Sequence, residues 1–390
     1  MATVQQSIGA VAALADCDGS WAPADARAVL EIDLDALMAN WKQLNDVAAP
    51  AECAGVVKAD AYGLGLEEIV TELSEAGCQT FFVASLEEGR RARMISPGAK
   101  IYILDGLLPG AEDYYKGFNL QPVLSSMPEI DEWAGICKDL GRRLPAAIHV
   151  DTGMHRLGIS SDDLDRLVEN NITEEFAPTL VMSHLACADE QVHPANAEQL
   201  KAFESVRQRL PGIPASLANS GGTFLGSDYL FDLVRPGIAL YGGRAFDSAP
   251  NPMRPVVTLS ARILQVQDVK PGDTVGYGAA HHVQQPARIA TIACGYADGF
   301  LRALGGDDTQ TGAVGYIGEY SVPIVGRVSM DLITLDVTDV PESQAHRGGW
   351  VEVMGGRVTV DDLTDRAGTI GYELLSRLSR RVHRVYRKRQ

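Results

Sequence analysis

The sequence lacks the features of a membrane, secreted or metal-binding protein. It has no run near the ~20 apolar residues that a membrane-spanning helix requires. Its first thirty residues hold short alanine-rich stretches but no basic segment, and acidic residues follow closely, which argues against a secretory signal. The six cysteines are irregularly spaced, with no CxxC pair and no Cys/His cluster of metal-ligand form. We therefore expect reduced thiols, no metal and a cytoplasmic location.

Positive charge is also scarce. The formal net charge of −17 excludes most nucleic-acid and anionic-membrane partners. Basic residues gather only at the end of the chain, where valine and arginine alternate from Arg381 onward. We interpret this tail as a solvated terminal strand rather than as a nucleic-acid-binding arm. The length of 390 residues and a hydrophobic content of 46% predict a large core and two domains.

The first part of the chain repeats one theme, in which a short apolar run is followed by a turn and a segment with helical spacing. Eight such runs are candidate strands: 54–58, 81–85, 101–105, 122–124, 146–150, 180–184, 215–219 and 237–242. The unit between residues 101 and 122 is the least regular. Eight strand–helix units in about 190 residues predict a (β/α)8 barrel of the TIM type.

After Pro255 the sequence pattern changes to short runs rich in valine, threonine and glycine, separated by turn residues. This pattern predicts a mostly β second domain. The chemistry of a (β/α)8 barrel lies at the carboxyl ends of its strands, so Lys58, His184 and Asn219 are candidate site residues. A lysine at a strand end is usually solvated, but burial or neighbouring cations can make its amine nucleophilic. Tyr62, four residues on, can donate its hydroxyl to an anion.

The segment VVKADAYGLG (56–65) resembles the lysine motif of the alanine racemase family, which binds pyridoxal 5'-phosphate (PLP). Further segments resemble that family in the same order: DTGMHRLG (151–158), SHLACADE (183–190), ANSGG (218–222), RPGIALYG (235–242), GYADG (295–299), GRVSMD (326–331) and GTIGYE (368–373). The resemblance covers roughly residues 28 to 390. It implies a racemase, with alanine as substrate and D-alanine supplied to peptidoglycan synthesis.

The resemblance also implies a domain organisation. A strand at 27–33 belongs to the C-terminal β domain, residues 34–255 form the PLP-binding barrel, and residues 256–390 form the β domain. Residues 1–26 are left as an N-terminal extension that can be disordered. Two chains would pair as a homodimer in which each β domain completes the partner's active site.

The resemblance assigns the cofactor contacts residue by residue. PLP would be covalently bound to Lys58, and Arg235 would face its pyridine nitrogen. The phosphate would be held by a set of N–H and O–H donors from Tyr62, Ser220, Gly237, Ile238 and Tyr372. Without the other motifs, ANSGG and RPG would be ordinary turns.

Racemisation needs one base on each face of the substrate, and the resemblance assigns Lys58 to one face and Tyr296 of the partner chain to the other. A tyrosine hydroxyl has an ordinary pKa of ~10, so it needs cationic or hydrogen-bonding help, which His184 beside Arg235 could supply. The resemblance also implies that Arg156 and the Met330 N–H bind the substrate carboxylate, with Arg156 contacting the PLP phenolic oxygen as well. The access channel would be lined by four further residues: Arg327, Asp331, Asp189 and Ile370.

One residue departs from the family pattern. Many members carry a carbamylated lysine seven residues before the arginine that matches Arg156, and this sequence has His149 there. A carbamate is therefore excluded. His149 itself, a water molecule or a small anion such as chloride could orient Arg156 instead.

Other functions stay open at this stage. A racemase of serine or of several amino acids would use the same motifs. A PLP-dependent decarboxylase of basic amino acids needs different partner residues, and GYADG with the RPG arginine argues against it. A non-catalytic PLP-binding protein would have no use for the second domain and Tyr296.

Overall fold

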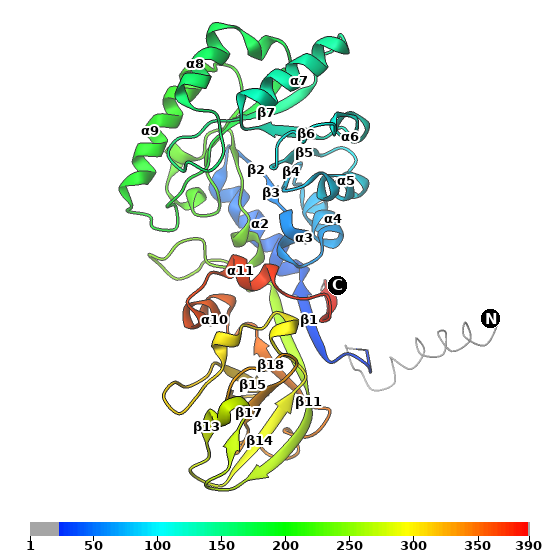
Figure 1. Ribbon diagram of the computed structural model, residues 1–390, viewed down its shortest axis with the longest axis vertical. Helices are drawn as coiled ribbons and strands as arrows, with labels where there is room; N and C mark the ends of the chain where they lie inside the picture. The colour runs from blue at the N-terminus through cyan, green and yellow to red at the C-terminus, as the bar shows by residue number, and fades with distance from the viewer. Residues whose placement is uncertain (1–22, 389–390) are drawn as a thin grey trace, which may run out of the picture. The chain divides into compact units, whose positions relative to one another are not determined.

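The computed structural model describes residues 23–388, which divide into two compact units (Figure 1). One unit joins residues 23–33 to residues from Pro255 onward, and the other is Leu34–Arg254. Of the N-terminal extension expected at residues 1–26, residues 1–22 lie outside the described part of the chain. Within the described part of the chain, no helix is long and apolar enough to cross a membrane.

The unit Leu34–Arg254 is built around a parallel sheet of seven strands that follow one another in chain order. Most of their residues are buried, as expected for strands with helices on the outside. The strands are β3 (Gly55–Val56), β4 (Thr80–Val83), β5 (Lys100–Ile103), β6 (Gln121–Leu124), β7 (Pro145–His149), β8 (Ala177–Met182) and β9 (Ala215–Ser216).

An eighth strand, β10 (Leu233–Val234), closes the sheet into a barrel. On one side it pairs in parallel with β2 (Glu52–Cys53), which runs directly into β3. On the other side, Asp232 N–H donates to the Ala215 carbonyl and Arg235 N–H to the Ala218 carbonyl, which joins β10 to β9. The (β/α)8 architecture expected from the sequence is therefore confirmed.

The prediction for the eighth strand was wrong in its position. The run GIALYG at 237–242 forms a 3-10 helix, η4 (Ile238–Tyr241), after the true strand β10. All four η4 side chains are buried because the segment packs against α2 rather than in the sheet. An apolar run of this length does not distinguish a buried strand from a buried helical turn.

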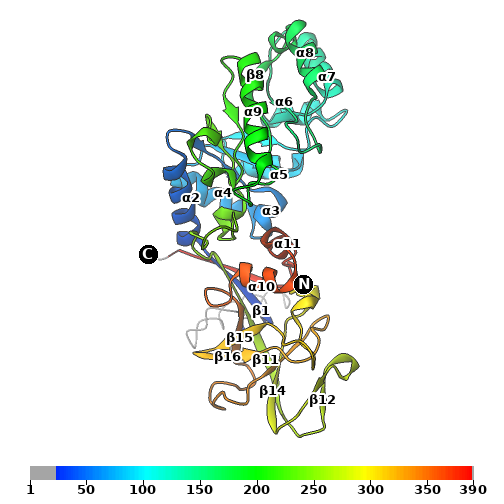
Figure 2. The same ribbon diagram turned by 90° about the vertical axis from the view of Figure 1, so that its left-hand side faces the viewer.

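Helices on the outside of the barrel follow the strands along the chain, and α2, α4 and α5 lie in succession (Figure 2). Side-chain caps set several of their starts: Ser85, Ser126 and Ser160 accept hydrogen bonds from the first turns of α5, α7 and α8. The helices are α2 (Leu34–Ala48), α4 (Leu66–Ala76), α5 (Leu86–Ile95), α6 (Glu112–Phe118), α7 (Met127–Asp139), α8 (Ser161–Glu169) and α9 (Pro194–Arg209).

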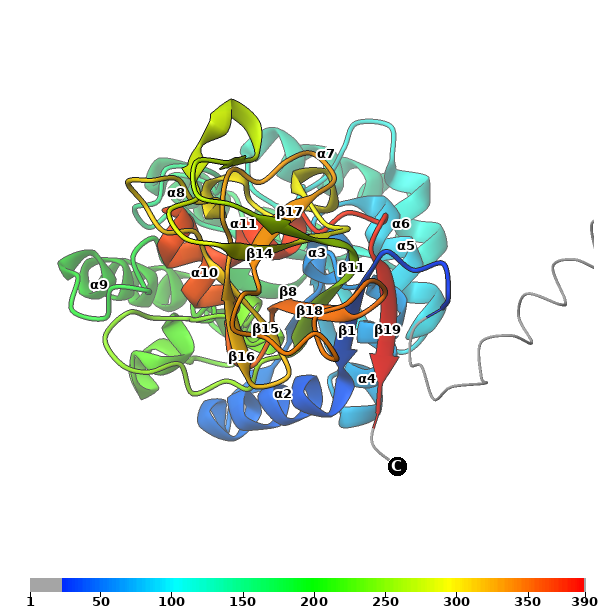
Figure 3. The same cartoon turned by 90° about the horizontal axis from the view of Figure 1, so that it is seen from below.

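The second unit is mostly β, as the sequence pattern after Pro255 predicts. Its main sheet has the strand order β16-β15-β18-β11-β1-β19 (Figure 3), with β14 and β17 added through β11. The strands are β1 (Ala28–Asp33), β11 (Val257–Val269), β14 (Ala287–Ile292), β15 (Val314–Ile317), β16 (Tyr320–Pro323), β17 (Ile333–Asp336), β18 (Trp350–Met354) and β19 (His383–Arg387). A small hairpin joins β12 (Thr274–Val275) to β13 (His281–His282).

Both ends of the described chain contribute to this sheet. Strand β1 pairs antiparallel with β11 and parallel with β19, so the alternating basic tail forms the terminal strand that its pattern predicts. Helices α10 (Val360–Ala367) and α11 (Gly371–Ser376) precede β19. The cysteines of the described residues are all free thiols.

Candidate active site

Lys58 follows strand β3 after one intervening residue, Val57, at the carboxyl end of the barrel. It begins the segment α3 (Lys58–Tyr62), in which Ala59, Asp60, Ala61 and Tyr62 all have φ between 53° and 57°. These residues form one turn of left-handed helix, closed by hydrogen bonds such as Gly63 N–H to the Ala59 carbonyl at 2.8 Å. A left-handed conformation costs a residue with a side chain roughly 1–2 kcal/mol. Four in succession mark this turn as a constrained segment of the kind found at functional sites.

Polar groups outside the turn hold it in place. One carboxylate oxygen of Glu88, on α5, accepts the Asp60 N–H at 3.0 Å, and the other accepts the Ala84 N–H at 3.0 Å. Arg91, one turn further along α5, donates to the Asp60 carboxylate at 2.7 Å and to Glu67 at 2.6 Å. The turn that carries Lys58 is therefore attached to the first turns of two helices.

The surroundings of Lys58 favour its neutral amine. Burial lowers its pKa, the nearby Arg156 cation lowers it further, and the carboxylates of Glu88 and Asp105 oppose the shift. A lysine with a lowered pKa is a better nucleophile and proton acceptor near neutrality than a solvated one.

Three of the expected phosphate-binding residues meet beside this turn. The Ser220 hydroxyl accepts the Gly237 N–H at 2.8 Å and the Ala239 N–H at 3.4 Å. A Cβ built on Gly237 would lie 2.2 Å from the Tyr62 hydroxyl oxygen. The Tyr62 ring packs against the Tyr241 ring at a centroid distance of 4.7 Å, with the two ring planes tilted by 33°.

This cluster fits a phosphate group. The Ser220 hydroxyl after β9 and the N–H groups at the start of η4 after β10 meet the Tyr62 hydroxyl from the turn after β3. These neutral polar groups lie at the last two strands, where barrels commonly bind phosphate, and Ser220 accepts the Gly237 and Ala239 N–H groups in this structure. Ile238, the remaining expected donor in the barrel, is buried within the same turn. The bare backbone of Gly237 is required because a side chain there would collide with Tyr62.

Arg235 directly follows strand β10, two residues before Gly237, and is 4% exposed. Its guanidinium donates to the Ser183 carbonyl at 2.6 Å and to the Ser216 hydroxyl, and it stands over the Phe82 ring. Burial lowers the pKa of Arg235, but an arginine stays protonated at neutral pH. It is therefore a fixed, buried hydrogen-bond donor.

His184 lies next to Arg235, with its Nδ1 3.4 Å from a guanidinium nitrogen. Because a guanidinium can only donate, Nδ1 accepts and the ring hydrogen is on Nε2. Burial and then Arg235 lower the pKa of His184 well below its ordinary value. His184 is thus neutral at pH 7, so it offers a hydrogen bond but no positive charge to a neighbouring tyrosine.

His149, at the end of β7, is buried, and its Nδ1 lies 3.4 Å from the Ser125 hydroxyl. Burial, and then the Arg235 and Arg156 cations, lower the pKa of His149 to about 4. The residue in this position is therefore a neutral side chain at pH 7. It does not supply the negative charge that a carbamate would bring.

The loop that carries Arg156 is shaped by Asp151. One carboxylate oxygen of Asp151 accepts the N–H groups of Gly153, Met154 and His155, and the other lies 2.8 Å from the His155 ring. Gly158 closes the loop at φ +114°, where a Cβ would lie 2.5 Å from the Asp151 nitrogen. Arg156 itself is exposed.

Two further expected residues lie in the barrel unit, where Asn219 is half-buried and Asp189 is exposed. The other expected site residues belong to the β unit, in two adjoining loops and at the start of α11. Tyr296 N–H donates to the Ser329 carbonyl at 3.0 Å and Ala297 N–H to the Met330 carbonyl at 2.9 Å. Tyr296 and Met330 are 39% and 54% exposed, and Arg327, Ile370 and Tyr372 are exposed as well. Asp331, next to Met330, is half-buried.

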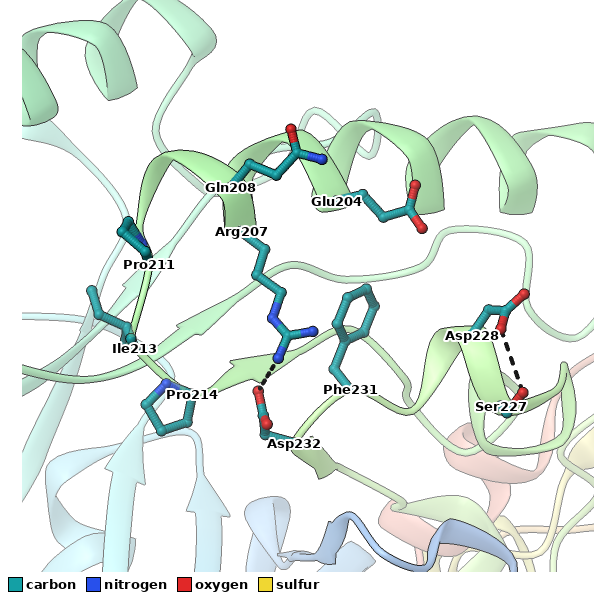
Figure 4. Close-up of a pocket in the computed structure, with 11 residues that line it drawn as sticks. Glu204, Arg207, Gln208, Pro211, Ile213, Pro214, Ser227, Asp228, Phe231 and Asp232 are labelled. Atoms are coloured by element: carbon teal, nitrogen blue, oxygen red, sulfur yellow. Dashed lines mark hydrogen bonds and ion pairs between the residues drawn. The ribbon is translucent and has the colours of Figure 1, made fainter.

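A cavity of about 880 Å³ lies elsewhere on the barrel, between α9 and the amino ends of β9 and β10. Figure 4 shows Arg207 pointing across it toward Asp232, 3.4 Å away, beside the Phe231 ring. The chemistry of a (β/α)8 barrel occurs at the opposite, carboxyl ends of its strands. We therefore place the candidate site around Lys58 rather than in this cavity.

Two supporting residues of the barrel site were missed by the sequence analysis, namely Glu88 and Arg91. The pattern Ser85-x-x-Glu88 after a strand is a capping box, so it signals the start of α5. The hydrogen bond that Glu88 accepts from the Asp60 N–H is a tertiary contact, which a local sequence pattern does not reveal.

Together, the barrel, a lysine of lowered pKa after its first strand and a cluster of hydroxyl and N–H groups that fits a phosphate at its last strands are features of a barrel-type, PLP-dependent class of enzyme. The chain matches the alanine racemase N-terminal domain over residues 32–245 and the alanine racemase C-terminal domain over residues 256–386. It therefore belongs to the alanine racemase family.

Relatives and solved structures agree with this assignment. An alanine racemase of Methylobacterium sp. is 49% identical over 92% of this chain and 97% of its own length. One of Rhizobium meliloti is 47% identical over 92% and 96%. The crystal structure of alanine racemase from Bartonella henselae with covalently bound pyridoxal phosphate has 40% identity and a TM-score of 0.87, covering 93% of this chain and 99% of that one.

Proposed function

We propose that this protein interconverts L-alanine and D-alanine, using PLP bound covalently to Lys58. The observation that carries the proposal is that Lys58, with its pKa lowered by burial, lies on a left-handed turn beside the polar cluster of Tyr62, Ser220 and Gly237. The names of the relatives support alanine as the substrate.

In this proposal Tyr62, Ser220, Gly237 and Ile238 hold the cofactor phosphate, with Tyr372 as a further donor. Arg235 donates to the pyridine nitrogen, and its fixed protonation keeps that nitrogen an acceptor. When bound, PLP withdraws electrons from the substrate Cα and so makes its proton removable.

Lys58 and Tyr296 act as the two proton-transfer groups. One takes the Cα proton from one face while the other delivers a proton to the opposite face, which inverts the configuration. The lowered pKa of Lys58 suits it to accept a proton. His184, neutral and with its hydrogen on Nε2, can donate a hydrogen bond to the Tyr296 oxygen.

Arg156 and the Met330 N–H bind the substrate carboxylate. Asp151 accepts N–H groups of the residues just before Arg156 and so fixes the backbone there. The backbone position of Arg156 therefore does not depend on a carbamate. Arg327 and Asp331, with Asp189 and Ile370, line the access channel and favour small substrates.

The active unit in this proposal is a homodimer in which Tyr296 enters the partner's site. Support comes from an exposed apolar group on the β unit, where Tyr296, Met330 and Leu332 lie on hydrogen-bonded loops. Exposed apolar residues that lie together are a common feature of protein–protein interaction sites. The substrate is a small amino acid, and no nucleic-acid or membrane partner is proposed.

The cellular role follows from the product. D-Alanine made in the cytoplasm would supply peptidoglycan synthesis. A relative from Mesorhizobium japonicum, 44% identical, is named a catabolic alanine racemase, and a catabolic role for this chain is the second candidate.

The test is a chiral-chromatography assay of purified holoenzyme with L-alanine, L-serine and L-lysine. We expect PLP absorbance that is lost in Lys58→Ala, and conversion of alanine to a near-equal mixture with serine much slower. Tyr296→Phe should abolish racemisation or confine proton exchange to one enantiomer. Faster turnover of serine would overturn the substrate assignment, and a Tyr296→Phe variant that racemises as the wild type does would overturn Tyr296 as the second proton-transfer group. PLP binding without racemisation in the wild type would indicate a non-catalytic PLP-binding protein.

A further inference from the structure

The C-terminal tail reaches the two loops that carry Tyr296 and Met330. Arg381, just before β19, donates to the Asp331 carboxylate at 2.6 Å, and its Nε lies 3.4 Å from the Asp298 carboxylate. Arg381 thus bridges Asp298, which lies two residues after Tyr296, and Asp331, which directly follows Met330.

Asp298 is the buried end of this bridge. It is 3% exposed, and its second carboxylate oxygen accepts the Gly295 N–H at 2.9 Å. Its backbone carbonyl also accepts the Ser379 N–H at 3.0 Å, so the tail contacts the Tyr296 loop at two points. A buried carboxylate is costly without a cation, and Arg381 is the cation that the structure places beside it.

The loops have little freedom to rearrange. A Cβ on Gly295 would lie 2.4 Å from the carbonyl oxygens of Ser329 and Met330, and one on Gly299 would lie 2.5 Å from the Arg377 carbonyl. Arg27 adds a hydrogen bond of 3.1 Å to the Asp331 carbonyl. The backbone around Tyr296 is therefore enclosed by the Met330 loop on one side and the tail on the other.

We propose that Arg381 is a positioning residue for racemisation, which fixes Tyr296 relative to Met330 by bridging Asp298 and Asp331. This inference rests on the proposed function. Arg381 contacts neither reacting atoms nor substrate in this role. It positions Tyr296, a proton-transfer group, and the Met330 N–H, which donates to the substrate carboxylate, through the two loops that carry them.

The role predicts an effect on one face of the substrate. Loss of the bridge would loosen the Tyr296 loop while the Lys58 turn, which lies in the barrel unit, keeps its own contacts with Glu88. The step in which Tyr296 takes the Cα proton would slow, and the step in which Lys58 does so would not. The primary isotope effect should therefore rise for the enantiomer whose Cα proton Tyr296 takes and should not rise for the other.

The experiment compares the holoenzyme with Arg381→Met, Arg381→Lys and Arg387→Met. Arg387 is a matched control because it is an arginine of the same tail, is exposed to a similar extent (44% against 40%) and pairs with Glu31 at 2.8 Å, away from both loops. Steady-state constants are measured in both directions with ordinary and Cα-deuterated L- and D-alanine. Hydrogen exchange of the peptide covering 294–300 reports on the loop independently of activity.

For Arg381→Met we expect kcat to fall roughly 10- to 100-fold, because small misplacements of a reacting group have effects of this size. KM should change less than kcat, the isotope effect should rise for one enantiomer only, and residues 294–300 should exchange faster. Arg381→Lys should recover part of kcat, and Arg387→Met should match the wild type.

Equal kinetics and equal exchange in Arg381→Met and Arg387→Met would overturn the inference and leave the proposed function intact. An isotope effect that rises equally for both enantiomers would also overturn it. If Arg381→Met does not fold, Asp331→Asn removes one arm of the bridge and must give the same one-sided change. A wild type that racemises no amino acid would instead refute the proposed function, while the exchange measurement would still report whether Arg381 holds the loop.

Discussion

The carboxylate of Glu88 accepts a hydrogen bond of 3.0 Å from the backbone N–H of Asp60, in the left-handed turn that begins at Lys58. The other oxygen of the same carboxylate caps the end of β4 through the Ala84 N–H. One side chain thus joins the strand β4, the start of α5 and the lysine turn. The strained turn is stable only because such contacts over-determine it.

Glu88→Gln should therefore weaken cofactor binding. An amide keeps the shape but loses the charge and one of the two acceptor oxygens, which removes charge-assisted hydrogen bonds worth about 1.5–3 kcal/mol. We expect the dissociation constant for PLP to rise roughly 10- to 100-fold, measured by titrating the apoprotein with PLP and following absorbance. Glu87→Gln, an exposed neighbour on the same helix, is the control and should bind PLP as the wild type does. Equal affinity in the two variants would show that the turn stands without Glu88.

Gly237→Ala should damage the phosphate cradle by steric conflict. The φ of Gly237 is −123°, which any residue adopts, so the effect comes from the Cβ placed 2.2 Å from the Tyr62 hydroxyl oxygen. We expect a large loss of PLP affinity with a smaller loss of thermal stability. In a Tyr62→Phe background the same glycine change should cost less, because the colliding oxygen is gone and the next ring atom is 3.0 Å away.

The control for that variant is Gly135→Ala. Gly135 lies inside helix α7 and its Cβ would meet nothing within 4 Å, so alanine should leave PLP binding unchanged and raise stability by roughly 0.5–1 kcal/mol. Additive losses for Gly237→Ala and Tyr62→Phe would contradict the steric explanation.

The sequence predicted much of this site because its chemistry depends on short segments. Lys58 to Tyr62, Ser220 and Arg235 to Ile238 each lie in one turn after a strand, so a local pattern brings the right residue types to the barrel mouth. The supports of these turns are long-range contacts. Glu88 is 28 residues from Asp60, and Arg381 is 50 residues from Asp331.

The prediction of where the eighth strand lies was wrong for a related reason. GIALYG is apolar enough for a barrel strand, and only the closure of β10 onto β2 shows that Leu233–Val234 fills that place. The neutral states of His149 and His184 were equally inaccessible, because they follow from burial beside Arg235 and Arg156.

Burial of His149 should make the protein less stable in acid. Its pKa falls from an ordinary 6.5 to about 4 in the folded state, so between those values the unfolded chain binds a proton that the folded chain does not. Stability is therefore lost as pH falls from about 6.5 to 4, by about 3 kcal/mol from this residue. Urea unfolding at pH 7 and pH 4.5 should show a smaller acid loss in His149→Asn than in the wild type. The exposed His346→Asn should lose as much as the wild type, and a His149→Asn variant that does the same would refute the prediction.

Arg156 should control the reactivity of Lys58 toward its cofactor. Burial is the larger cause of the lowered pKa of Lys58, and the Arg156 cation adds to it. Arg156→Gln removes only the second cause, so the pKa of Lys58 should rise and less free amine should be present at neutral pH. The rate at which apoprotein binds PLP covalently, followed by absorbance between pH 6 and pH 10, should therefore move to higher pH in this variant. Arg166→Gln, an exposed arginine paired with Asp131 on the outside of the barrel, should leave the profile in place. A profile that moves to lower pH in Arg156→Gln, or that moves equally in both variants, would show that Arg156 does not set the charge state of Lys58.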